Sequence, residues 1–81
     1  MKQAERRKVD ALHQTATHLA VLRAAEADLE RLIARALHWG ATWSEIAGVL
    51  GVTRQSAHER YRRLHYDPTN GVAWREPPLP L

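Results

Sequence analysis

Cysteine and phenylalanine are both absent from this 81-residue chain. Without cysteine there is no disulfide bond and no thiolate metal site, which is consistent with a reducing cytosol. No apolar run approaches the roughly 18 residues of a membrane-spanning helix. The charged start, MKQAERRK, is not followed by the apolar segment of a signal peptide. We therefore expect a soluble, cytoplasmic protein with no membrane-embedded part.

Catalytic motifs are missing from the sequence as well. The five histidines are scattered, and His13 and His18 lie five residues apart, on different faces of a helix, with no acid at HExxH spacing. Neither a glycine-rich phosphate loop nor a nucleophile motif is present. We therefore expect no enzymatic activity, no cofactor and no metal site.

Glycine and proline do not occur between Ala4 and His38, where apolar residues recur at steps of three and four. This spacing predicts helix. One unbroken helix over these 35 residues would be about 52 Å long, which leaves two alternatives. Either the helix breaks near residues 15–17, or it is one long helix with a function at each end.

Heptad spacing sorts this segment into two columns, which read Leu12, Leu19, Glu26, Ile33 and Thr15, Leu22, Leu29, Ala36. The stripe either packs on later helices of the same chain or joins two subunits. A chain this small buries only roughly 60% of its unfolded surface, and too little of it remains to cover so long a stripe. We therefore expect a homodimer, with residues 1–28 as the dimerisation helix. Its contact residues are Leu12, Leu19, Leu22 and Leu29.

Two short helices separated by a glycine turn are predicted to follow. Gly40 suits the left-handed position after the long helix, and Thr42 with Glu45 has the spacing of a capping box. The first short helix ends at Gly51. Its expected buried residues are Ile46, Ala47, Val49 and Leu50. Trp39 and Trp43, on either side of the preceding turn, are expected to pack in the core or at a hinge.

The second short helix is predicted at about residues 53–64. Thr53 is its expected N-cap, and its inward stripe is Ala57, Tyr61 and Leu64. A small residue at Ala47, a turn glycine four positions later at Gly51, and apolar neighbours on both sides of that glycine are the spacing of a helix-turn-helix. Gly51 also tolerates the positive φ that such a turn requires.

The stretch EIAGVLGVTRQSAHERYRRL resembles the helix-turn-helix of bacterial transcription regulators, in particular the promoter-reading region of sigma factors and small actinobacterial or phage regulators. The resemblance covers residues 42–64, or 30–64 if the long helix supplies the first helix of a trihelical unit. It places the exposed start of a recognition helix at Thr53. The family usually has an aliphatic residue where this chain has Arg60, and Tyr61 is expected to fill that space.

The resemblance implies that the second short helix enters the major groove of DNA by its N-terminal end. Arg54 then pairs with guanine and Gln55 with adenine, while Thr53 and Ser56 contact phosphate. His58 lies one turn further along, and Arg62 and Arg63 contact the DNA backbone. Glu59 either accepts from cytosine or pairs with one of these arginines. The expected DNA-binding residues are Thr53, Arg54, Gln55, Ser56, His58, Glu59, Arg62 and Arg63.

Charge is distributed in a way that fits this interpretation. Formal net charge is +3 overall, with +3 in residues 1–8, −2 in residues 9–50 and +3 in residues 51–65. Two basic ends around an acidic middle are typical of a surface that faces a polyanion, although an ordinary solvated surface gives the same totals. Arginine outnumbers lysine ten to two, which suits forked contacts with phosphate.

The C-terminal residues 66–81 differ in composition from the rest. Asp67 to Gly71 is turn-forming sequence, and the proline-rich end favours an extended tail. A small hairpin, with Tyr66 on one side and residues 72–74 on the other, is the alternative. The expected fold is all-α: an N-terminal helix (1–28), a helix-turn-helix unit (29–65) and an extended tail (66–81).

Three functions remain open at this point. The first is a sequence-specific transcriptional regulator that binds double-stranded DNA. The second is a protein-interaction module that binds a protein partner through the long helix and the C-terminal tail. The third is an accessory DNA architectural factor in partition or excision. The first agrees best with the spacing and the charge.

Overall fold

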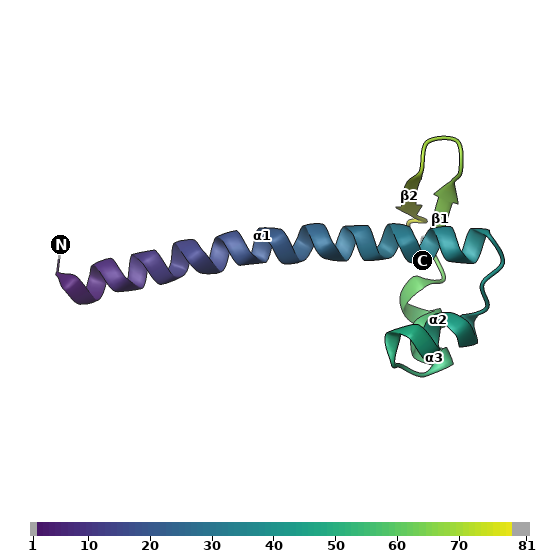
Figure 1. The fold of residues 1–81 in the computed structure, drawn as a ribbon, viewed down its shortest axis with the longest axis horizontal. Helices are drawn as coiled ribbons and strands as arrows, with labels where there is room; N and C mark the ends of the chain where they lie inside the picture. Colours follow the sequence, from purple (N-terminus) through teal and green to yellow (C-terminus); the bar gives the residue numbers. More distant parts are fainter. Residues whose placement is uncertain (1, 79–81) are drawn as a thin grey trace.

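The computed structural model describes residues 2–78, and Figure 1 shows their arrangement. In chain order the elements are α1 (Gln3–His38), α2 (Trp43–Leu50), α3 (Arg54–Tyr61), β1 (Leu64–Asp67) and β2 (Val72–Arg75). The molecule is elongated, with extents of 57 × 31 × 28 Å. Most of α1 projects away from the other elements, which gather around its C-terminal end (Figure 1).

α1 is one continuous helix, so the second of the two alternatives is confirmed and there is no break at residues 15–17. The hydroxyls of Thr15 and Thr17 donate to the carbonyls one turn back, of Ala11 and His13, at 2.8 and 3.1 Å. These bonds keep both threonines within the helix. Although the helix is long, no helix in the described part of the chain has both the length and the apolar character needed to cross a membrane.

The end of α1 and the start of α2 are fixed by local hydrogen bonds, as the sequence predicts. Gly40 has φ of 102°, and the Gly40 and Ala41 amides donate to the carbonyls of Leu37 and Ala36. This is a Schellman motif. The Thr42 hydroxyl accepts from the Glu45 amide, and the Glu45 carboxylate accepts from the Thr42 amide, which completes the capping box.

The turn between α2 and α3 also follows the prediction. Gly51 lies in the left-handed region at φ 72°, and the Ala47 carbonyl accepts from the amides of Gly51 and Val52. Thr53 then caps α3 by accepting from the Ser56 amide at 3.1 Å. As a result, two short helices are held at an angle across three residues.

The core lies where α1, α2 and α3 meet. The buried apolar residues there are Ile33, Ile46, Ala47, Ala57 and Tyr61, and Ala34 of α1 is buried outside this cluster. Two of the expected core residues are not in it: Val49 is 87% exposed, and Trp39 is 70% exposed. Val49 faces solvent because a helix of eight residues presents only one narrow stripe to its neighbours. Trp43, in contrast, packs against the core.

The expected all-α fold is wrong in one respect, because residues 64–75 form an antiparallel hairpin. Tyr66 pairs with Ala73 and His65 with Trp74, so the hairpin alternative is confirmed and the extended tail is wrong for these residues. Their turn is closed by the Asp67 carboxylate, which accepts from the Thr69 amide at 2.9 Å. Residues 76–78 have no regular secondary structure, and the last three tail residues lie outside the described range.

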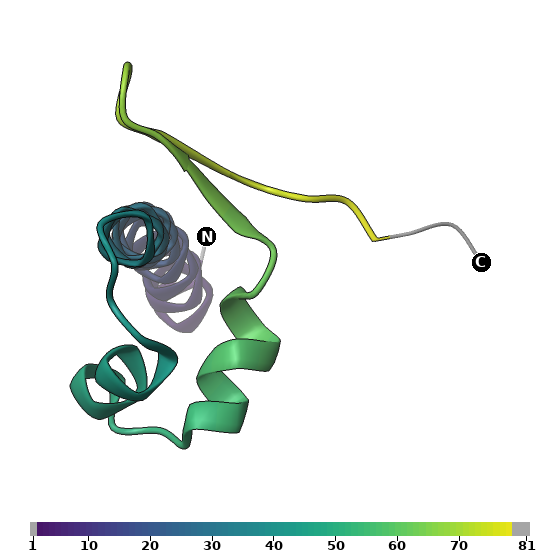
Figure 2. The same ribbon diagram turned by 90° about the vertical axis from the view of Figure 1, so that its right-hand side faces the viewer.

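One side chain of the hairpin, Arg75, forms hydrogen bonds with both α1 and α3. Arg75 donates to the Glu30 carboxylate on α1 and to the Arg60 carbonyl on α3. Figure 2, viewed along α1, shows α2 and α3 on one side of this helix and the hairpin on another. α3 ends at Tyr61, so it is shorter than the predicted helix of residues 53–64. Leu64 belongs to β1, although it still packs against the core.

Candidate nucleic-acid interface

The first turn of α3 is a short exposed polar surface. Thr53, Arg54, Gln55 and Ser56 are all exposed. The Thr53 hydroxyl both accepts from the Ser56 amide and donates to the Ser56 hydroxyl, at 2.9 Å. This capping arrangement fixes the direction in which the first turn leaves the glycine turn. The positive end of the helix dipole lies at the same place.

Gln55 and Glu59 are linked one turn apart on the outer side of α3. The Gln55 amide group donates to the Glu59 carboxylate at 3.3 Å. The sequence left two alternatives for Glu59, a contact with cytosine or a pair with Arg62 or Arg63. In the structure its partner is Gln55. The bond is long and exposed, so little free energy is needed to exchange it for a contact with another polar group.

His58 is oriented by the neighbouring helix. Its ring lies edge-on to Trp43 of α2, with ring centroids 5.1 Å apart. His58 therefore sits beside α2 while remaining exposed, one turn after Arg54 on α3. Trp43, at the start of α2, therefore contacts α3 through His58 and also packs against the core.

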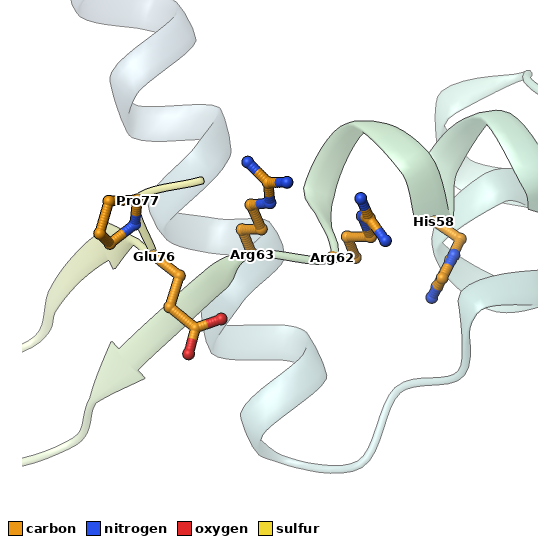
Figure 3. Close-up of a pocket in the computed structure, with 5 residues that line it drawn as sticks. All are labelled: His58, Arg62, Arg63, Glu76 and Pro77. Atoms are coloured by element: carbon orange, nitrogen blue, oxygen red, sulfur yellow. The ribbon is translucent and has the colours of Figure 1, made fainter. Parts of the chain in front are cut away.

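Arg62 and Arg63 lie beyond the end of α3, whereas the predicted helix of residues 53–64 included both. Arg62 is the C-cap, its amide donating to the His58 carbonyl at 2.8 Å, and Arg63 lies between the helix and β1. Together with His58 and Glu76 they line an open depression of about 670 Å³. Figure 3 shows that the Glu76 carboxylate points the opposite way from both guanidinium groups.

The basic side chain nearest to the Glu76 carboxylate is that of His65. Their side chains approach to 3.4 Å between Oε1 and Nε2, but the angles do not make a hydrogen bond, and His65 Nε2 is buried without a partner. The distance is compatible with an ion pair only when the imidazole is protonated. The Glu76 amide donates to the Arg63 carbonyl at 2.8 Å, so the chain after β2 is tied to the end of α3.

Tyr61 fills the core position. In helix-turn-helix regulators, which this stretch resembles, an aliphatic residue at the position of Arg60 fills it. Tyr61 is buried, and the guanidinium groups of Arg60 and Arg75 lie 5.5 and 5.8 Å from its ring centroid. Arg60 itself is exposed and was not among the expected site residues. The sequence did indicate that Arg60 is exposed. Ala57 and Tyr61 are four residues apart and form the inward stripe, so position 60 lies outside that stripe.

The structure therefore distributes the expected site residues along α3, with His58 and Glu59 in its middle. Thr53 to Ser56 occupy the first turn, while Arg62 and Arg63 follow the last. Comparison with family models, with curated proteins and with solved structures gave no match for this chain. Among residues 2–78, no three histidine, aspartate or glutamate side chains come together as metal ligands.

Proposed function

We propose that the protein binds double-stranded DNA through α3 and regulates transcription. The observation that carries the proposal is the exposed first turn of α3, which α2 and the Gly51 turn present outward from a small core. A helix held in this way can enter the major groove with its N-terminal residues against the base edges. The resemblance to bacterial helix-turn-helix regulators supports the same function.

Each exposed residue has a chemical role in this proposal. Arg54 donates two hydrogen bonds to guanine, and Gln55 exchanges its bond with Glu59 for a pair of bonds to adenine. Thr53 and Ser56 approach phosphate at the helix N-terminus. Arg62 and Arg63, at the other end, neutralise phosphates without reading sequence.

A homodimer in the cytoplasm of a bacterium, or of a cell infected by a phage, completes the proposal. One helix-turn-helix contacts few base pairs, and dimers double the contact by placing two recognition helices about 34 Å apart. The exposed leucines of α1, from Leu12 (59% exposed) to Leu29 (42%), are the surface offered for the subunit contact. Leu12, Leu19, Leu22 and Leu29 all remain exposed in the folded chain, which supports their contact with a second copy.

Selection of bound duplexes from a random pool is the experiment that tests the proposal. A regulator enriches a short motif with two related half-sites. Binding without any enriched motif contradicts sequence-specific recognition and favours the architectural function. Failure to retain any duplex contradicts DNA binding and favours the protein-interaction module, whose main support is the same exposed face of α1.

A further inference from the structure

The projecting part of α1 carries an apolar face that is exposed along most of its length. Every residue from Asp10 to Leu29 is exposed. The face ends at Ile33, which is only 5% exposed because α2 and α3 cover it. About 30 residues, or roughly 45 Å of helix, are therefore available to a partner. The inference below concerns that partner and rests on the proposed dimer.

Glu26 decides how a second copy can lie along this face. It occupies the same heptad column as Leu12 and Leu19. In a parallel, in-register pair of helices, each residue of this column meets its own copy, so two Glu26 carboxylates would face each other. Like charges in such a seam oppose association. In an antiparallel pair, Glu26 meets a residue of the other column instead.

The charges along α1 favour the same orientation. Residues 2–8 have a net charge of +3, whereas residues 26–32 contain three acidic residues and Arg31 and have a net charge of −2. Glu30 is already paired with Arg75, and Asp28 lies on the side of α1 next to the hairpin, which leaves Glu26 to face a partner. Antiparallel helices put the basic end of one copy beside the acidic part of the other, whereas parallel helices put like charges together.

We propose that a second copy of this chain covers α1 in an antiparallel arrangement centred near Thr17. In this register Lys8 lies opposite the partner's Glu26, Leu12 opposite the partner's Leu22, and Thr15 opposite the partner's Leu19. The overlap spans residues 2–32 and stops before Ile33, which α2 and α3 bury. A centre one layer further along would push the partner's first turns into the space above Ile33, which those helices already fill.

Two features beside the seam fit this register. Ala11 and the partner's Ala25 flank the seam between the Lys8 and Leu12 layers. Their small side chains allow the helix axes to approach closely there. A depression of about 270 Å³ lies beside Glu26 and Leu29, bounded on the other side by Val52 and Arg60. The first turns of the partner's α1 end at this depression, where Arg60 lies within reach of the acidic Glu5 of the partner subunit.

The register also sets the spacing of the two α3 helices. Ser56 and Arg60 of α3 share the lining of this depression with Glu26 and Leu29, so α3 lies level with that part of α1. In an antiparallel pair centred at residue 17, those levels are about 27–36 Å apart along the helices. This range includes the roughly 34 Å between successive major grooves on one side of DNA.

Spin labels test the arrangement directly, because the chain has no cysteine and one label site is therefore unique. Gln3→Cys, labelled in the full chain, is expected to give a distance of about 42 Å between copies, and Thr17→Cys a much shorter one. Both positions are exposed. Short distances at both sites would overturn the antiparallel orientation. About 52 Å from Gln3→Cys would overturn the register centred on Thr17.

Charge exchange gives an independent readout. Lys8→Glu is expected to weaken the dimer by roughly tenfold in its dissociation constant, because two attractive pairs become repulsive. Lys8→Glu combined with Glu26→Lys is expected to restore it. Failure of the double variant to recover contradicts the pairing of these residues. A monomer at every concentration overturns the dimer while leaving DNA binding by α3 to be measured separately.

Discussion

Single side chains of α3 carry most of the proposed specificity. Arg54 and Gln55 follow the Thr53 cap directly, so their backbone positions are held by the bond between the Thr53 hydroxyl and the Ser56 amide. Fixed backbone positions reduce the conformational entropy that base contacts would otherwise cost. The residues at the other end, Arg62 and Arg63, lie on less regular backbone and suit non-specific phosphate contact.

Loss of either proposed base contact is expected to relax base preference. Arg54→Ala and Gln55→Ala should each lower discrimination by roughly 1–3 kcal/mol at one or two base positions. Sequence selection with each variant measures this. Arg35→Ala, an exposed arginine at the end of α1, is the matched control and should keep the wild-type motif. The same motif from all three variants would mean that α3 is not the recognition helix.

Glu45 gives the structure a pH dependence of known sign. Hydrogen bonds from Thr42, the backbone amide first and the hydroxyl second, hold the pKa of the Glu45 carboxyl below its ordinary value of 4.5. A carboxyl with a lowered pKa in the folded state stabilises the fold above its unfolded pKa, and this contribution is lost as pH falls through the folded pKa. The contribution is therefore present at pH 7 and disappears below 4.5.

Glu45→Gln isolates this contribution. The wild type is expected to be more stable than the variant at pH 7, and the difference should shrink in acid below the ordinary pKa of 4.5. Urea unfolding of both proteins at neutral and acidic pH, at equal protein concentration, measures the difference. An equal difference at both pH values would show that the charge of Glu45 does not contribute through the capping box.

At the scale of helices and strands, local signals predicted far more than long-range ones. The caps at Gly40, Thr42, Gly51 and Thr53 were predicted from the sequence, because each depends on residues only three to five positions away. The hairpin was only an alternative, since pairing of β1 with β2 and attachment by Arg75 depend on contacts across the chain. The end of α3 at Tyr61 was not predicted either, because it depends on the same contacts across the chain.

The candidate site was predictable to a similar extent. The exposed first turn of α3 follows from Thr53 and the inward stripe, so it was placed correctly. The exposure of Arg60 follows from the prediction that Tyr61 fills the core position. The bond between Gln55 and Glu59 was not predicted, because it depends on side-chain rotamers. Val49 was expected to be buried and Trp39 to pack in the core or at a hinge, but only their apolar character was known from the sequence.

Two glycines in α2 and its turn provide a matched pair of substitutions. Gly48 lies within the helix and Gly51 in the left-handed region, and an added Cβ meets nothing within 4 Å at either position. Gly48→Ala is therefore expected to stabilise the fold by roughly 0.5–1 kcal/mol. Gly51→Ala is expected to destabilise it by roughly 1–2 kcal/mol, because only the backbone conformation is unfavourable.

Urea unfolding at fixed protein concentration measures both glycine variants. Gly51→Asn serves as the control, since asparagine tolerates the left-handed region better than alanine does, and its loss should be smaller. Stabilisation by Gly51→Ala would mean that the turn does not have the positive φ on which the angle between α2 and α3 depends.

At the scale of the whole molecule, the shape of α1 is what separates this protein from a compact helix-turn-helix domain. The small core at one end supports a helix that continues far beyond it (Figure 1). An exposed apolar face of this length is a typical site of association. The account therefore assigns two tasks to one chain, subunit contact along α1 and DNA contact through α3.

Separation of these two tasks is a further prediction. Leu19→Glu with Leu22→Glu places two charges in the seam and is expected to dissociate the dimer. Affinity for a two-half-site operator should fall, while weak binding to random duplex should remain. Sedimentation of wild type and variant at micromolar concentration measures the assembly. A wild-type mass near the 9.2 kDa of one chain would contradict the homodimer.

The most direct test of the central claim, DNA binding through α3, is the salt dependence of affinity for a duplex. Fluorescence anisotropy with a labelled duplex, from about 50 to 200 mM salt, should show a steep linear fall of log affinity with log salt, because phosphate contacts release counterions. Arg62→Ala should weaken binding to every sequence and reduce the slope by about one. Salt-independent affinity, or no binding at the lowest salt, would contradict the account.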